Sequence, residues 1–139
     1  MKKVALVLTM LLLCTLLLCA CKPPQWSEQI QRDIDKVKEL GFTVYMDNSS
    51  ERIKQHNQSW KETLERDGET FSVETVNICG LVKDLKIVVF EEFKTEEQAK
   101  NMYEYCVKAE GKPKYVLLGK VLVLSTSDEA SELLGYDFK

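Results

Sequence analysis

Histidine is nearly absent from this chain of 139 residues, since His56 is the only one. A zinc site needs several ligands at matched spacing, and no second histidine is there to help form one. A serine triad would have only one possible base, and no serine lies in a G-x-S-x-G turn. His56 stands among glutamines and asparagines, so we expect it to lie on the surface of a polar helix.

Glycine is also scarce, and the six glycines are scattered along the chain. A phosphate-binding loop needs several of them together, and neither this pattern nor a C-x-x-C pair or a calcium loop occurs. Paired carboxylates do occur, as at Glu91 and Glu92, but adjacent residues of a strand point to opposite faces. We therefore expect no metal, no cofactor and no set of catalytic residues.

Basic residues are too few for a nucleic-acid surface. The chain has 19 lysines and arginines against 22 aspartates and glutamates, a net charge of −3. Without Lys2 and Lys3, which belong to the N-terminal segment described next, 17 basic residues face 22 acidic ones. A domain with this balance is repelled by phosphate backbones, so no nucleic-acid partner is expected.

The longest apolar run lies at the N-terminus. Lys2 and Lys3 precede it, and residues 4–18 carry no charge and only two threonines among apolar side chains. A positive start, an apolar middle and a small residue at the cleavage site are the three parts of a secretory signal. The lysines stay on the cytoplasmic side while the apolar run enters the bilayer.

The end of this run reads Leu18-Cys19-Ala20-Cys21. It resembles the lipobox of bacterial lipoprotein precursors, in which a small residue precedes the cysteine that receives the lipid. The resemblance implies a signal peptide over residues 1–20, lipid on Cys21, and a place at the extracytoplasmic face of a cell membrane. An uncleaved anchor is the alternative, since residues 4–21 reach the lower edge of a membrane span.

Residues 21–26 form a short tether, which contains Pro23-Pro24 and so favours extended backbone. Residues 27–139 then suit a single domain with one modest core. Within it, cap residues and apolar periodicity predict helices over residues 27–40, 51–66 and 96–109 and a short helix that ends at Leu134. Runs rich in β-branched residues predict strands over residues 42–46, 71–81, 85–93, 115–118 and 121–125.

The order of these elements is α-β-α-β-β-α-β-β-α. Two hairpins and one β-α-β crossover predict an α+β domain, with a mixed, mostly antiparallel sheet of about five strands and helices packed on it. Residues 121–124 are apolar on both faces of their strand, which is typical of a central strand covered on both sides.

Cys79 and Cys106 are the only cysteines after Cys21. A hairpin turn at Lys83-Asp84 would place Cys79 opposite Val88, and Cys106 lies at a similar height on the following helix. One hypothesis is a disulfide between them, which an extracytoplasmic location permits. The alternative is two buried thiols, because free cysteine packs like a small apolar residue.

The stretch from Phe90 to Lys100, followed by Gly119-Lys120-Val121 and a short capped helix, resembles small lipoproteins of low-GC Gram-positive bacteria. Those families have no assigned activity, so the resemblance implies a fold type and an anchored location. We expect a non-enzymatic binding or interaction module, attached to the membrane by lipid, with an envelope protein or a wall polymer as partner. The alternative is a small carboxylate-dependent hydrolase of the envelope.

The lipid anchor is tested by Cys21→Ala. We expect the wild-type protein to carry the added mass of lipid and to fractionate with membranes, and the variant to lose that mass. Cys14→Ala is the control, since Cys14 follows Leu13 and should not be the lipidated residue. A Cys21→Ala protein that matures at the membrane with an unchanged mass would contradict the lipoprotein assignment.

Overall fold

The computed structural model describes residues 25–111 and 113–139. The elements follow the predicted order: α2 (Glu28–Glu39), β1 (Thr43–Met46), α3 (Ser50–Arg66), β2 (Thr75–Lys83), β3 (Lys86–Phe93), α4 (Glu96–Lys108), β4 (Lys114–Leu118), β5 (Val121–Ser125) and α5 (Asp128–Leu134). Leu18, Cys19, Ala20 and Cys21 lie outside the described residues, so the lipid anchor stays a prediction. In the part of the chain that the structure describes, no helix has the length and apolar character needed to span a bilayer.

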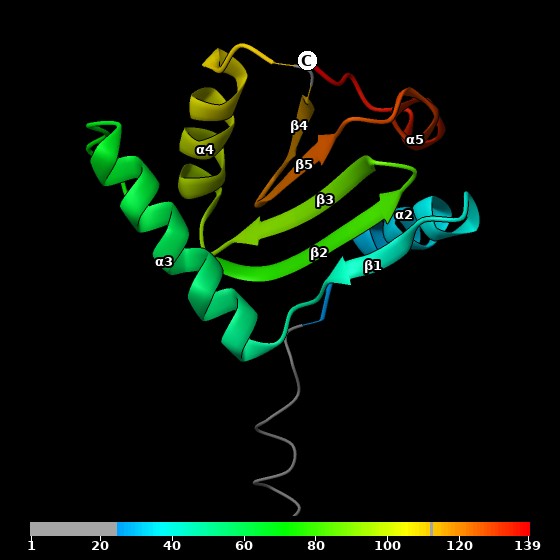
Figure 1. Ribbon diagram of the computed structural model, residues 1–139, viewed down its shortest axis with the longest axis horizontal. Coiled ribbons are helices and arrows are strands. Elements are labelled where there is room, and N and C mark those ends of the chain that lie inside the picture. The colour runs from blue at the N-terminus through cyan, green and yellow to red at the C-terminus, as the bar shows by residue number, and fades with distance from the viewer. Residues whose placement is uncertain (1–24, 112) are drawn as a thin grey trace, which may run out of the picture.

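The strands form one sheet in the order β1-β2-β3-β5-β4 (Figure 1). The predicted α+β class is confirmed, and every pair of neighbouring strands is antiparallel. The crossover through α4 makes β3 and β4 parallel to each other, but β5 lies between them and pairs with both. The central place of β5 explains why it is apolar on both faces.

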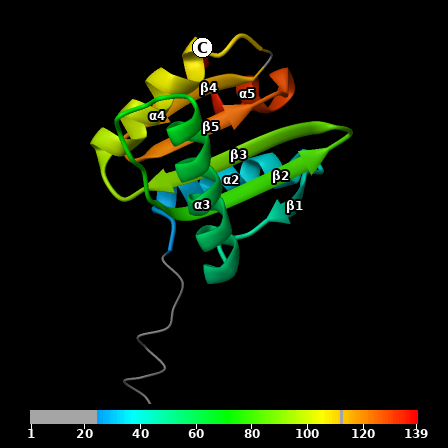
Figure 2. The ribbon, with the colours of Figure 1, turned by 60° about the vertical axis from the view of Figure 1, so that its left-hand side comes forward.

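Helices cover both faces of the sheet (Figures 1 and 2). On one face, α2 and α5 enclose a first core with the buried side chains of β2, β3 and β5, among them Leu81, Phe90 and Val123. On the other face, α3 and α4 enclose a second core that includes Leu64, Phe93, Met102 and Leu122. The sheet therefore separates two apolar layers, which differ in how their helices are attached.

Some bounds differ from the prediction, most of all at β2, which begins at Thr75 and not at residue 71. The β2–β3 turn is centred on Asp84 and Leu85, which both have positive φ, rather than on Lys83-Asp84. Cys79 consequently faces Phe90 and not Val88. The last helix is capped by Ser127, whose hydroxyl accepts a hydrogen bond from Ala130 N.

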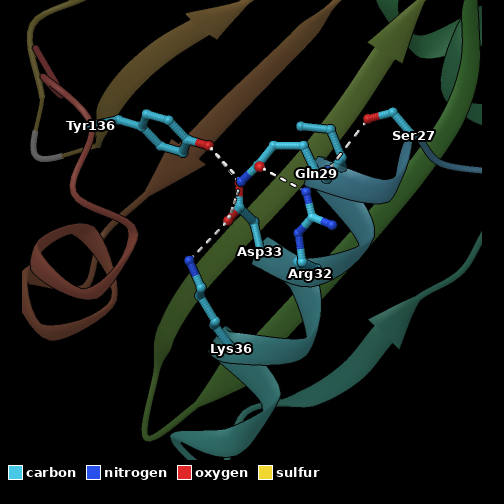
Figure 3. Close-up of polar contacts among 7 residues, drawn as sticks. Ser27, Gln29, Arg32, Asp33, Lys36 and Tyr136 are labelled. Atoms are coloured by element: carbon cyan, nitrogen blue, oxygen red, sulfur yellow. Dashed lines mark hydrogen bonds and ion pairs between the residues drawn. The ribbon is translucent and has the colours of Figure 1, made fainter.

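The C-terminal tail is attached to α2 by a buried carboxylate (Figure 3). The side chain of Asp33 has no exposed surface, and its Oδ2 accepts a hydrogen bond of 2.6 Å from the Tyr136 hydroxyl. Gln29 and Lys36 donate to the same carboxylate from the turns before and after it. A buried carboxylate needs such hydrogen-bond donors. The Asp33–Tyr136 hydrogen bond also joins α2, near the start of the domain, to its C-terminal tail.

Candidate functional site

The most unusual group of side chains lies under α3, around a buried carboxylate of β3. Glu91 is 5% exposed, and its Oε1 accepts three hydrogen bonds. The donors are His56 Nε2 at 2.8 Å, Trp60 Nε1 at 2.9 Å and Thr75 Oγ1 at 2.5 Å. A carboxylate can only accept, so His56 Nε2 is the donor in this contact. We call Glu91, His56, Trp60 and Thr75 the Glu91 cluster.

The expectation that His56 is a surface residue is wrong. Its side chain is 22% exposed and lies against the sheet, because it belongs to the narrow buried stripe of α3. The stripe runs through Ile53, Trp60 and Leu64, and His56 falls three residues after Ile53 and four before Trp60. That spacing is the signal in the sequence that would have placed His56 on the buried side.

Glu91 and Glu92 do not converge, as the strand geometry predicts. Glu91 points to α3, whereas Glu92 Oε2 accepts a hydrogen bond of 2.8 Å from Asn77 Nδ2. Glu91 lies next to Phe90 in the middle strand of the sheet, which helices cover on both faces, and this position makes it buried. A buried carboxylate in such a strand requires donors from another element, and α3 supplies two of them.

A second polar contact of α3 lies one residue further along the helix. Asn57 Oδ1 accepts a hydrogen bond of 2.7 Å from Thr75 N, and Asn57 Nδ2 donates one of 3.0 Å to Thr75 O. The side-chain amide thus pairs with the backbone of one residue as a neighbouring strand would. Asn57 and the Glu91 cluster together fix α3 to β3 and to the start of β2.

A groove of about 1250 Å³ lies along the other flank of α3. One wall is α3 itself, and the opposite wall is the segment 69–74, which leads from α3 to β2. Its apolar lining comes from Ile53, Leu64, Phe71 and Val73, while Lys54, Lys61 and several carboxylates line its rim. We call this hollow the α3 groove. Asn57 belongs to its lining as well, so the contact that attaches α3 also shapes the groove.

Aromatic contacts link the Glu91 cluster to the groove wall. The ring of Trp60 meets that of Tyr105 of α4 edge to face, with centroids 6.5 Å apart. Tyr105 meets Phe71 in the same way at 6.3 Å. The Tyr105 hydroxyl donates a hydrogen bond to Asp67, which raises the pKa of Tyr105 to about 12 and lowers that of Asp67. These contacts hold Phe71 in position at the groove.

Of the two hypotheses for Cys79 and Cys106, the structure agrees with two buried thiols and not with the disulfide, because both cysteines are free. Cys79 pairs with Phe90 and so points into the first core, while Cys106 of α4 packs with Phe93 in the second core. A similar height along the strands does not bring the two sulfur atoms together, because the two side chains lie on opposite faces of the sheet. Burial raises the pKa of both thiols, and that of Cys106 reaches about 12.

Within residues 25–111 and 113–139, no group of three or more histidine, cysteine or carboxylate side chains is placed to hold a metal ion. The Glu91 cluster is itself a pairing of one imidazole with one carboxylate. The Glu91 cluster and Asn57 attach α3 to the sheet, and Asn57 also lines the groove.

Glu91→Gln should destabilise the fold by about 2 kcal/mol, because buried hydrogen bonds to a charged group each contribute about 1.5–3 kcal/mol. Urea unfolding measures the loss. Glu92→Gln is the matched control, since Glu92 is the adjacent carboxylate and accepts one side-chain hydrogen bond from Asn77. We expect it to cost less than half as much, and equal losses would show that the Glu91 cluster does not hold α3.

Both thiols should resist alkylation at neutral pH in the native protein and react fully after denaturation without reductant. The thiolate is the reactive form, and the raised pKa values together with burial keep it scarce. Mass spectrometry of the peptides that contain Cys79 and Cys106 measures the modification. A pair that stays unmodified in denaturant until a reductant is added would restore the disulfide.

The comparisons with known proteins supply no relative for this chain. No protein-family model, no curated protein and no solved structure gives a significant match. The α3 groove and the contacts that shape it are the features of the molecule from which a function can be inferred.

Proposed function

We propose that this protein is a membrane-anchored, extracytoplasmic lipoprotein that acts as a non-enzymatic binding module, with the α3 groove as its binding surface. The observation that carries the proposal is the groove itself. Pockets for small ligands usually measure about 300–1,000 Å³, and the α3 groove is larger, at about 1250 Å³. Its size suits a segment of a polymer better than a small metabolite.

The way in which α3 is attached supports this proposal. A binding surface loses less free energy on binding when its walls are already fixed. Asn57 and the Glu91 cluster hold α3 against the sheet, and the contact between Phe71 and Tyr105 orders the opposite wall. Both walls of the groove are therefore positioned by contacts made inside the domain, before any ligand is bound.

The proposed anchor restricts the partner. Lipid on Cys21 and a tether over residues 21–26 would keep the groove within a short distance of the membrane surface. An envelope protein or a wall polymer at that surface is then the partner class that fits the proposal. The acidic balance of the domain remains an argument against nucleic acid.

A carboxylate-dependent hydrolase is the second candidate, and the His56–Glu91 pair is the observation in its favour. A histidine bound to a carboxylate is a common arrangement for a general base. However, the Oε1 atom of Glu91 already accepts three hydrogen bonds, and neither His56 nor Glu91 lines the groove. The geometry supports binding better than hydrolysis.

Site-specific photocrosslinking on the anchored protein in its membrane tests the binding surface. A benzophenone side chain at Gln58, which lines the groove on α3, should capture one recurrent partner. Gln31 is the matched control. Each glutamine donates to a carboxylate four residues later, Gln58 to Glu62 and Gln31 to Asp35, but Gln31 lies on α2 at the other face of the sheet.

Capture from position 58 and none from position 31 would support the groove as the binding surface. Equal capture from both positions, or none from either, would contradict it. If the groove captures nothing, hydrolysis by the full-length protein becomes the function to assay, with His56→Ala as the inactive control.

A further inference from the structure

We propose that the α3 groove binds an uncharged stretch of a glycan chain, whose hydroxyl groups form hydrogen bonds with both walls of the groove. This inference rests on the proposed binding function and names the ligand class of the same site. Three features of the lining support it, namely its balance of charge, its hydroxyl groups and its length.

The charges of the lining cancel once their partners are counted. Four carboxylates and two lysines line the groove, at Asp47, Glu65, Glu69, Glu74, Lys54 and Lys61. Asp47 Oδ1 lies 3.7 Å from Arg52 Nε, and Glu74 Oε2 lies 2.8 Å from Lys94 Nζ. The two carboxylates that remain are matched in number by the two lysines. A ligand with a net charge of either sign would meet like charges along this groove, so the lining favours an uncharged ligand.

Hydroxyl groups are available on both walls of the groove. Ser49 and Ser50 lie at the start of α3, and Thr70 and Ser72 lie on the opposite segment. All four residues are exposed, and none of their hydroxyls makes a hydrogen bond to another group in the part of the chain that the structure describes. A hydroxyl both donates and accepts hydrogen bonds, and so does each hydroxyl of a sugar. The two walls therefore present polar groups that match those of a sugar chain.

Ser49 differs from the other residues that precede helices. Ser27, Thr95 and Ser127 each accept a hydrogen bond with their side chain from the first turn of their helix. Ser49 occupies the same position before α3, but its side chain makes no capping bond. A serine at this position usually stabilises its helix through that bond. The Ser49 hydroxyl is instead available to a ligand in the groove.

The groove follows nearly the whole length of α3. Its lining residues recur every three or four positions along the helix, at Ser50, Ile53, Asn57, Lys61 and Leu64. The distance from Ser50 to Leu64 along the helix is about 21 Å at 1.5 Å per residue. A site of this length suits a chain of several sugar units better than a single sugar.

Apolar side chains give the sugar rings a surface on which to pack. A sugar ring is polar at its edge, where the hydroxyls lie, and less polar on its faces, where the C–H groups lie. Phe71 and Val73 line the groove and are half-buried, so part of each side chain stays exposed. Phe71 is also held by Tyr105, with ring centroids 6.3 Å apart. Burying C–H groups against a surface that is already fixed contributes to binding at little cost in order.

Isothermal titration calorimetry tests this proposal on the purified full-length protein, in micelles of a detergent that carries no sugar. The probes are cellotetraose and tetra-N-acetylchitotetraose, which are uncharged chains of equal length. We expect at least one of them to bind, and Ser50→Ala and Ser72→Ala each to weaken that binding about threefold or more, because each removes one hydrogen bond. Ser59→Ala is the matched control, since Ser59 is an exposed serine of α3 that does not line the groove, and it should bind as the wild type does.

Failure of both probes to bind at millimolar concentration would overturn the glycan as the ligand. Equal binding by the three serine variants would overturn the role of the groove hydroxyls. Tighter binding of the deacetylated, cationic form of the second probe, or of anionic tetragalacturonate, would overturn the uncharged ligand. The proposed function is judged separately, since capture of a protein from Gln58 without any glycan binding would contradict the glycan and still support the groove as the binding surface.

Discussion

The position of α3 depends on one buried carboxylate. Among the described side chains of α3 only Leu64 is buried, while Ile53 and Trp60 are half-buried, so polar contacts are needed beside the apolar ones to attach the helix. Burying a leucine side chain stabilises a fold by about 1.5–3 kcal/mol, and one hydrogen bond to a charged group stabilises it by a similar amount. Glu91 receives two such bonds from α3, and a third from Thr75, the residue that Asn57 also holds.

This polar attachment leaves one flank of α3 and the segment 69–74 open to a ligand. At the other end of the sheet the chain closes its own edge, since Lys139 and Tyr115 exchange two backbone hydrogen bonds of 2.7 Å and 2.9 Å. Asp33 holds the tail that makes this closure, through Tyr136. The tail thus covers the β4 edge of the sheet, whereas the α3 groove stays open.

The sheet also keeps its two cores chemically separate. Cys79 and Cys106 lie on opposite faces, so each thiol is protected by the packing of its own layer, and burial keeps its pKa high. A disulfide between these two cysteines therefore does not stabilise the domain. Apolar packing in two layers and a few buried polar contacts between helices and strands have to suffice.

The amino-acid sequence by itself determined the order of the elements, most of their bounds and the central place of β5. Those features follow from capping, periodicity and turn residues, which act over a few neighbouring positions. Only the tertiary structure decided that His56 meets Glu91, 35 residues later, that Cys79 and Cys106 face apart, and that a groove opens beside α3. Each of these depends on strand register and on which face a helix covers, and both are set by packing between segments distant in the chain.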